Sequence, residues 1–145
     1  MSLRSTAKIG LAITILAAVT LSFENSILAV GFVAILVQIL SALIMIWARF
    51  TFGVRSFHAT PDPTEGGLVT SGPYHYLRHP IYAAILYFIW AGILSHISFL
   101  NMILGLCASI GLSMRIFAEE RLVTERYPDY VEYASRTRRI IPFIF

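Results

Sequence analysis

Charged side chains are scarce in this sequence. Asp, Glu, Lys and Arg together make up 13% of its 145 residues, whereas hydrophobic residues make up 57%. Soluble domains carry about a quarter charged residues, so this composition excludes an ordinary soluble protein. The mean hydropathy of +0.75 agrees with that exclusion. We therefore predict an all-α, polytopic membrane protein with a single domain over residues 1–145.

Cysteine is almost missing as well. Cys107 is the only one, so no disulfide can form within the chain. It lies in an apolar run, where we expect it to be a small packing residue. The histidines His58, His75 and His96 lack the spacing of metal ligands, so we expect no metal site. We also expect no nucleic-acid partner.

Charge is absent from four apolar blocks, residues 9–23, 26–48, 80–95 and 97–114. About 20 apolar residues cross a bilayer, so we predict about four transmembrane helices. The first block is short, and a cleaved signal peptide is its alternative interpretation, although no clear cleavage site follows. Transporters place ionisable residues within their spans, so their absence argues against a small transporter. Gln38 is expected to make an interhelical hydrogen bond.

Basic residues are missing from two loops, near residues 24–25 and 96. All eleven lie on the opposite side of the four-span arrangement: Arg4, Lys8, Arg49, Arg55, Arg78, Arg115, Arg121, Arg126, Arg136, Arg138 and Arg139. Lys and Arg favour the cytoplasmic side of membrane proteins. We therefore predict an integral protein of the inner or plasma membrane, with both termini in the cytoplasm.

A polar stretch, residues 58–82, interrupts the apolar sequence. It contains two turn or helix-start signals, Gly72-Pro73 and His79-Pro80, and several aromatic rings. The connector around it is too long for a simple turn, and long loops in compact domains are usually functional. We interpret this stretch as the rim of an active site. Taken alone, Arg78 and His79 would suit interfacial anchors better.

A second polar region, residues 115–142, follows the fourth apolar block. The residues with helical spacing are Arg115, Glu119, Leu122 and Arg126. We therefore expect the fourth helix to continue as a charged helix up to Pro128, where a second short helix starts. Tyr127, Tyr130 and Tyr133 recur every three residues, which is typical of a packing surface or an aromatic belt.

The third and fourth blocks are separated only by a short loop, which predicts a tight helical hairpin. Such a hairpin brings both polar regions to the same end of the molecule. The side chains that we expect to lie close together are Arg78, His79, Tyr82, Arg115, Glu119 and Glu120. Taken alone, the two glutamates would be better explained as a solvated helix face.

Two sequence motifs make the functional prediction more specific. The first is Leu68-Val69-Thr70-Ser71-Gly72-Pro73-Tyr74 followed by Arg78-His79-Pro80-Ile81-Tyr82. The second is Arg115-x-x-x-Glu119-Glu120-x-Leu122, then Tyr130-x-x-Tyr133 and Arg139-x-x-Pro142. In order and spacing they resemble the signature of the isoprenylcysteine carboxyl methyltransferase family, and a similar signature occurs in the related phospholipid N-methyltransferases. The resemblance covers about half of the chain.

The resemblance implies S-adenosylmethionine-dependent methyl transfer at a membrane surface. The residues that it implies for cofactor binding are Leu68, Val69, Gly72, Tyr74, Arg78, His79, Pro80, Tyr82, Glu120 and Arg139. An arginine would pair with the cofactor carboxylate through its planar guanidinium, and a tyrosine ring would face the sulfonium. As catalytic residues, Arg115 would orient an anionic group of the acceptor, and Glu119 would position or deprotonate the nucleophile.

The acceptor stays open at this point. We expect a lipophilic molecule, a lipid or an isoprenoid-like compound, that is methylated on a carboxylate, an amine or a thiol. A carboxylate needs no base, whereas an amine or thiol needs one. The alternative enzyme is an NADPH-dependent membrane reductase of the steroid-reductase type, which ends in a similar Arg-His-Pro-x-Tyr motif. A small transporter or scaffold is the alternative without chemistry. No oligomeric state is predicted.

Overall fold

The computed structural model describes residues 2–53 and 67–141, and it is built of helices. Their bounds are α1 (Leu3–Phe23), α2 (Phe32–Phe52), the short 3₁₀ helix η2 (Gly72–His75), α3 (Pro80–Ser95), α4 (Phe99–Arg126) and α5 (Tyr130–Arg136). Across these two ranges there is no strand, and one isolated β-bridge joins Leu77 to Arg138. The predicted all-α fold is therefore confirmed. Residues 58–66 of the predicted site region, and Pro142, lie outside the described residues.

Three of the helices, α1, α2 and α4, are long and apolar enough to cross a membrane. α3 is also apolar but has 16 residues, which is about 24 Å at a rise of 1.5 Å per residue. The chain is thus a polytopic integral membrane protein, as expected. α4 runs without a break over 28 residues, so the fourth helix does continue beyond its apolar part. The limits of the membrane spans stay predictions.

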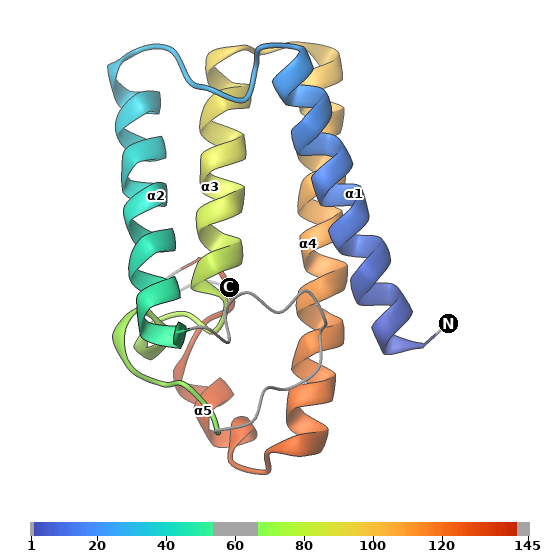
Figure 1. Ribbon diagram of the computed structural model, residues 1–145, viewed down its shortest axis with the longest axis vertical. Helices are drawn as coiled ribbons and strands as arrows, with labels where there is room; N and C mark the ends of the chain where they lie inside the picture. Colours follow the sequence, from blue (N-terminus) through green and yellow to red (C-terminus); the bar gives the residue numbers. More distant parts are fainter. Residues whose placement is uncertain (1, 54–66, 142–145) are drawn as a thin grey trace.

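The four long helices pack as two pairs, which Figure 1 shows side by side. α1 lies along α4 and α2 lies along α3, and these are the most extensive helix contacts. α3 and α4 are consecutive, but they contact each other much less. The predicted short connection between these two helices is present, but each of them packs mainly on another helix. Gly10 and Gly111 explain the preference, because they let the backbones of α1 and α4 approach closely.

Gln38 joins α2 to α3 by a hydrogen bond, close to the end of the bundle opposite the polar regions. Its Nε2 donates to Phe88 O of α3 over 3.0 Å and to Ile27 O over 2.7 Å. Its Oε1 accepts from Ala29 N over 2.9 Å. A buried amide is stable in an apolar surrounding only when its donors and acceptors are used. The predicted interhelical hydrogen bond of Gln38 is confirmed.

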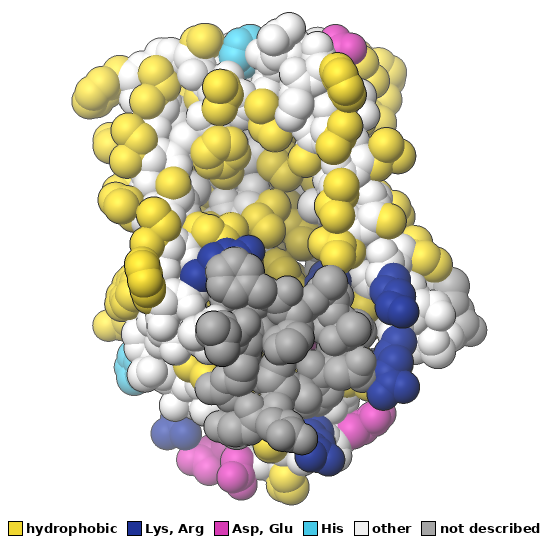
Figure 2. Space-filling view, in the orientation of Figure 1, with side chains coloured by type: hydrophobic (Ala, Val, Ile, Leu, Met, Phe, Trp, Pro, Cys, Tyr) yellow, Lys and Arg dark blue, Asp and Glu magenta, His cyan; other side chains and the backbone are white. Residues whose placement is uncertain are grey.

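Charged and apolar surfaces are separated along the molecule. Figure 2 shows hydrophobic side chains over the upper body of the bundle, and most of the Lys, Arg, Asp and Glu side chains around its lower end. α2 contributes large exposed apolar side chains, among them Phe32 and Phe50. Such a surface suits lipid tails rather than water. The charged end is where α4 ends, α5 lies and α3 begins (Figure 1).

Candidate active site

Backbone pairing assembles the charged end of the molecule. Residues 137–141, here called the C-terminal strap, lie against the loop that leads into α3. Arg78 N donates to Arg138 O over 2.7 Å. His79 N donates to Arg139 O over 3.0 Å. The strap thereby holds Arg139 beside the Arg-His-Pro sequence, although the two are far apart in the chain.

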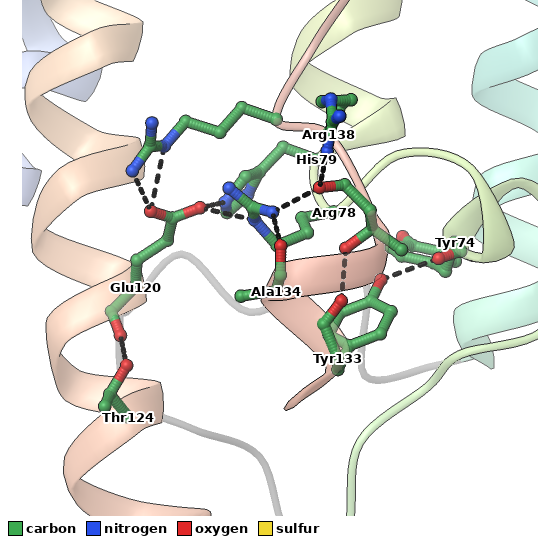
Figure 3. Close-up of polar contacts among 10 residues, drawn as sticks. Tyr74, Arg78, His79, Glu120, Thr124, Tyr133, Ala134 and Arg138 are labelled. Atoms are coloured by element: carbon green, nitrogen blue, oxygen red, sulfur yellow. Dashed lines mark hydrogen bonds and ion pairs between the residues drawn. The ribbon is translucent and has the colours of Figure 1, made fainter. Parts of the chain in front are cut away.

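Glu120 on α4 is the centre of a first group of side chains (Figure 3). Its Oε1 accepts from Arg78 Nε over 2.8 Å. Its Oε2 accepts from Arg139 Nε over 2.9 Å. His79 Nε2 lies 3.4 Å from Glu120 Oε1. These four residues are called the Glu120 cluster below, and they join the α3 entrance, α4 and the strap through one carboxylate.

Arg78 is held on more than one side. Its side chain is 9% exposed, and its Nη1 donates to Ala134 O over 2.7 Å and to Thr137 O over 2.6 Å. These carbonyls belong to the end of α5 and the start of the strap, where helix-end carbonyls need donors. Arg78 therefore caps α5 as well as pairing with Glu120, so it fixes the geometry of the whole cluster.

The Glu120 carboxylate is stabilised in its charged form. Burial alone would raise its pKa, but the adjacent His79 and Arg78 side chains outweigh burial and lower the pKa from 4.5 to about 2. Glu120 is therefore an anion at neutral pH, and it pairs with both Arg78 and Arg139. Guanidinium groups held in this way can form charge-assisted hydrogen bonds with an anionic group of a ligand.

Glu119, the neighbour of Glu120, belongs to a second group of side chains. Tyr82 Oη donates to Glu119 Oε1 over 2.6 Å, and Arg115 Nε donates to Tyr82 Oη over 2.7 Å. Arg115 Nε also lies 2.8 Å from Glu119 Oε1. These three residues are called the Arg115 cluster. Arg115 is only 3% exposed, and its charge is balanced by Glu119.

His79 connects the two clusters. Its ring stacks on the Tyr82 ring with a centroid distance of 5.5 Å and an interplanar angle of 10°. Pro80, fully buried, begins α3 between them, at a helix position where proline is well tolerated. His79 Nε2 is buried without a hydrogen bond of good geometry. Its nearest charged neighbour is Glu120 Oε1 at 3.4 Å, so its hydrogen-bonding capacity is only weakly used.

A pocket of about 630 Å³ opens beside the Glu120 cluster. Its polar wall includes Arg78, Glu120 and Arg139, and its apolar wall includes Phe117 and Tyr130. The remaining lining residues are Arg121, Thr124, Glu125, Val131 and Ala134. Ligand pockets in proteins measure roughly 300–1,000 Å³. This pocket is therefore of the right size for a small organic molecule with both charged and flat apolar parts.

Besides Pro80, four residues predicted for the cofactor site lie outside both clusters. Leu68 and Val69 are half-buried in the segment that leads into η2. Gly72 has φ +58° and packs on α2, because an added Cβ would lie 2.7 Å from Thr51 Oγ1. Tyr74 packs against α2 and receives a hydrogen bond on its carbonyl from Tyr133. None of these four residues lines the pocket beside the Glu120 cluster.

Two simpler interpretations of the sequence are wrong. Glu119 and Glu120 do not form a solvated helix face, because their side chains are only 16% and 12% exposed. Arg78 and His79 are not interfacial anchors that point to solvent, since their side chains are 9% and 11% exposed. In both cases burial is made possible by a partner of opposite charge.

Two residues that line the pocket, Tyr130 and Phe117, were not predicted from the sequence to do so. Tyr130 was expected only to pack, yet it lines the pocket while Tyr133 makes the packing contact. Phe117 is on α4, and the guanidinium carbon of Arg139 lies 5.0 Å from the centroid of the Phe117 ring. Its position three residues before Glu120 was the available signal, because residues three apart share a helix face.

These features define a membrane protein with a charged, largely buried site at one end of its helices, next to a pocket for a small organic ligand. The model of the phospholipid methyltransferase family matches residues 26–130, and the chain belongs to this family. The residues that match the family model begin after the end of α1. Among the residues described by the structure, His, Cys, Asp and Glu form no group of three that could hold a metal ion.

Two curated proteins are similar to part of the chain. One is the cobalt-zinc-cadmium resistance protein CzcN of Cupriavidus metallidurans, 33% identical over 76 residues, or 52% of this chain and 35% of that protein. The other is the nickel-cobalt-cadmium resistance protein NccN of Alcaligenes xylosoxydans xylosoxydans, 32% identical over 52% of this chain and 36% of that protein. The chain thus matches about a third of the length of these relatives. No solved structure matches it significantly.

Proposed function

We propose that this chain is an enzyme that transfers a methyl group from S-adenosylmethionine to a lipophilic acceptor at the cytoplasmic membrane face. The observation that supports this most is the Glu120 cluster, which holds two guanidinium groups beside a pocket of about 630 Å³. Membership of the phospholipid methyltransferase family supports the reaction class. The apolar helices support an acceptor that reaches the site from the membrane.

The charged groups of the pocket fit the cofactor's amino-acid part. S-adenosylmethionine has a carboxylate, and planar guanidinium groups pair well with carboxylates. Arg139 and Arg78 are the candidates, and Glu120 holds both in place. We propose that Glu120 orients these arginines, and that the buried Nε2 of His79 meets a further polar group of the cofactor.

The apolar wall fits the rest of the cofactor. Phe117 and Tyr130 line the pocket with aromatic rings, and aromatic side chains stack well on flat heterocycles. Leu68, Val69, Gly72 and Tyr74 stay proposed contacts at the rim. The charged and the aromatic residues of the proposed cofactor site thus line the same pocket.

The Arg115 cluster is the proposed acceptor side. When bound, S-adenosylmethionine supplies a methyl group attached to a positively charged sulfur. Arg115 and Glu119 lie further back along α4, towards its apolar part, with Tyr82 between them. Their role is to align the acceptor and exclude water, which are the main demands of an in-line displacement. Glu119 takes the acceptor's proton if the acceptor is an amine or a thiol, and a carboxylate needs no base.

Calorimetric titration with S-adenosylhomocysteine, the demethylated form of the cofactor, tests the proposal directly. Purified protein in detergent should bind it with one site per chain, and a parallel titration with NADPH should give no heat. Binding of NADPH alone would favour the reductase alternative. A folded sample that binds neither compound contradicts the proposed cofactor.

Variants show whether any binding uses the predicted pocket. His79→Ala and Glu120→Ala should remove binding of S-adenosylhomocysteine, because they take away the centre of the cluster. Glu132→Gln is the matched control, since Glu132 is an exposed α5 carboxylate that pairs only with Arg136. It should bind like the wild type. Equal loss in all three variants would indicate unfolding rather than a site.

A transfer assay addresses the acceptor. The protein is incubated with methyl-labelled S-adenosylmethionine and a total lipid extract, and the label is followed into the organic phase. We expect labelled lipid with the wild type and none with Glu120→Ala. Label found only on a water-soluble product would contradict the lipophilic acceptor, while leaving the methyltransferase proposal intact.

A further inference from the structure

α1 lies outside the part of the chain matched by the family model, which covers residues 26–130. Nevertheless, α1 makes the most extensive contact with α4 of any helix. We propose that α1 is a positioning element of the active site, and that the contact between Gly10 and Gly111 sets the place of Arg115. This inference rests on the proposed methyl transfer for its catalytic consequence, but its structural part can be tested without activity.

The contact leaves no room for a side chain. A Cβ added to Gly10 would lie 2.3 Å from Gly111 O and 3.2 Å from Arg115 N. A Cβ added to Gly111 would lie 2.5 Å from Gly10 O and 2.7 Å from Thr14 Oγ1. The distances to the carbonyl oxygens of Gly111 and Gly10 are too short for any side chain, whereas the distance to Arg115 N is a tight contact that a small shift relieves. The two backbones therefore touch at the turn of α4 that carries Arg115.

Beside the glycine contact, a hydrogen bond from the Thr14 side chain also joins α1 to α4. Thr14 Oγ1 lies 3.3 Å from Ala108 O, which is on α4 one turn before Gly111, and 3.0 Å from Gly10 O. Threonine and glycine at such crossings replace lipid contact by backbone and hydroxyl contact. The crossing of α1 and α4 is thus fixed both by shape and by a polar bond.

The position of Arg115 is sensitive to this crossing. Its Nε reaches Tyr82 Oη over 2.7 Å and Glu119 Oε1 over 2.8 Å, and hydrogen bonds weaken beyond about 3.2 Å. Glu119 is on the same helix and moves with Arg115, but Tyr82 is on α3. A shift of about 1 Å in this turn of α4 would therefore break the bond to Tyr82, and misplacement of that size can lower a rate about a hundredfold. The Glu120 cluster lies farther along α4 and is held by the strap, so it should tolerate the shift.

The first test is kinetic. Gly10→Ala should lower kcat for methyl transfer by about tenfold to a hundredfold, because α1 is pushed away from the Arg115 turn. The KM for S-adenosylmethionine and the affinity for S-adenosylhomocysteine should stay within about twofold. Ala12→Val is the matched control, since Ala12 is an exposed position on the same helix, and it should leave both constants unchanged. Unchanged kcat in Gly10→Ala, or a matching loss of cofactor affinity, overturns the proposal.

A double-mutant cycle asks whether α1 acts through Arg115. In the Arg115→Lys background, Gly10→Ala should lower the residual rate by less than about twofold, because the group that it displaces has already been changed. If the two effects multiply, α1 supports the fold in general and does not position Arg115. Thr14→Val keeps the size of the side chain and removes its hydrogen bond, so it provides a milder variant if Gly10→Ala does not fold.

Hydrogen exchange provides a readout that needs no activity. In Gly10→Ala, or in Thr14→Val, amides of residues 111–119 should exchange faster than in the wild type, while those of α5 should be unchanged. Equal protection of residues 111–119 in wild type and variant overturns the positioning role. Because this measurement needs neither cofactor nor acceptor, it stays decisive even if the wild type fails to bind S-adenosylhomocysteine, which would contradict only the proposed function.

Discussion

Glu119 and Glu120 are neighbours on α4, yet they belong to two different kinds of cluster. Successive residues of a helix are turned by about 100°, so Glu120 faces the strap and the pocket while Glu119 faces Tyr82 of α3. The Glu120 cluster is assembled from the α3 entrance, α4 and the strap. The Arg115 cluster consists of side chains from α3 and α4, and its arginine is almost fully buried.

The two clusters also differ in charge. The Glu120 cluster contains two arginines for one carboxylate and borders a pocket. The Arg115 cluster contains one arginine for one carboxylate, and Tyr82 bridges them. On the proposed function, the first cluster meets the carboxylate of the cofactor and the second cluster meets the lipophilic acceptor. The same helix, α4, would then contribute side chains to both sites.

The largest effect should follow from Glu120→Gln. It leaves Arg78 in a largely buried site without its anion, and breaking one partner of a buried pair costs about 3–5 kcal/mol. We expect binding of S-adenosylhomocysteine to weaken more than a hundredfold, and the free energy of unfolding to fall by about 3 kcal/mol. Calorimetry and denaturant unfolding in detergent measure the two quantities.

Glu119→Gln is the control for that comparison. The Glu119 side chain lies at the next position of the same helix and is similarly buried. This variant should disturb the Arg115 cluster while leaving the affinity for S-adenosylhomocysteine within about threefold. If both glutamines weaken cofactor binding equally, the division into a cofactor cluster and an acceptor cluster is wrong.

Much of the fold was predictable, because it depends on local properties of the sequence. Apolar blocks predict membrane helices wherever they are, and the lack of Gly or Pro between Met114 and Pro128 predicted that α4 continues to Arg126. The pairing of the helices was not predictable in this way. The pairing depends on a close approach of Gly10 and Gly111, which are far apart in the sequence.

The composition of the site was predicted better than the arrangement of its contacts. Both clusters contain the residues expected to meet, because helix periodicity and the order of the motifs already limit which faces converge. The capping of α5 by Arg78 was not predicted, since it needs the carbonyls of Ala134 and Thr137 at one place. The contact of Tyr74 is another one that could not be predicted from the sequence. Its contact with Phe52 depends on how η2 packs on α2, which no spacing in the sequence specifies.

The pH dependence of stability should distinguish the Glu120 cluster in the unaltered protein. The pKa of Glu120 is lowered to about 2 in the folded state, so its stabilising contribution is complete above its ordinary pKa of 4.5. That contribution is lost as the pH falls from about 4.5 towards 2. We expect a loss of about 3 kcal/mol, since each pKa unit corresponds to about 1.4 kcal/mol.

Comparison with Glu120→Gln isolates this contribution from the other carboxylates. The free energy of unfolding is measured from about pH 7 to about pH 2 for both proteins, the range over which the contribution is lost. The two curves should converge on acidification, because protonated Glu120 resembles glutamine in charge. Parallel curves would mean that Glu120 has an ordinary pKa, and that its two arginine contacts do not stabilise the charged form.

Tyr82→Phe should have a smaller effect, and on the other cluster. It removes the hydroxyl that joins Arg115 to Glu119 but keeps the ring that stacks on His79. We expect kcat for methyl transfer to fall about tenfold, which corresponds to about 1.4 kcal/mol, with cofactor affinity within about twofold. Tyr76→Phe, at an exposed position, is the control. Loss of cofactor affinity in Tyr82→Phe would instead support the cofactor-binding role that the family resemblance implies for this tyrosine.

The smallest effect should come from Arg136→Gln, which tests whether position rather than charge makes the site. Arg136 lies three residues before Arg139, but it pairs with Glu132 on the surface of α5, where both side chains are at least 70% exposed. Exposed pairs of this kind contribute at most about 0.5 kcal/mol. Arg139→Gln removes one charge as well, yet it should weaken S-adenosylhomocysteine binding about tenfold, because Arg139 pairs with Glu120 at the pocket. Both variants are titrated with S-adenosylhomocysteine in low and in high salt. If positive charge attracts the ligand in general, both variants should lose the same affinity, and the loss should depend on salt. If the position of the guanidinium matters, only the Arg139 variant should lose affinity.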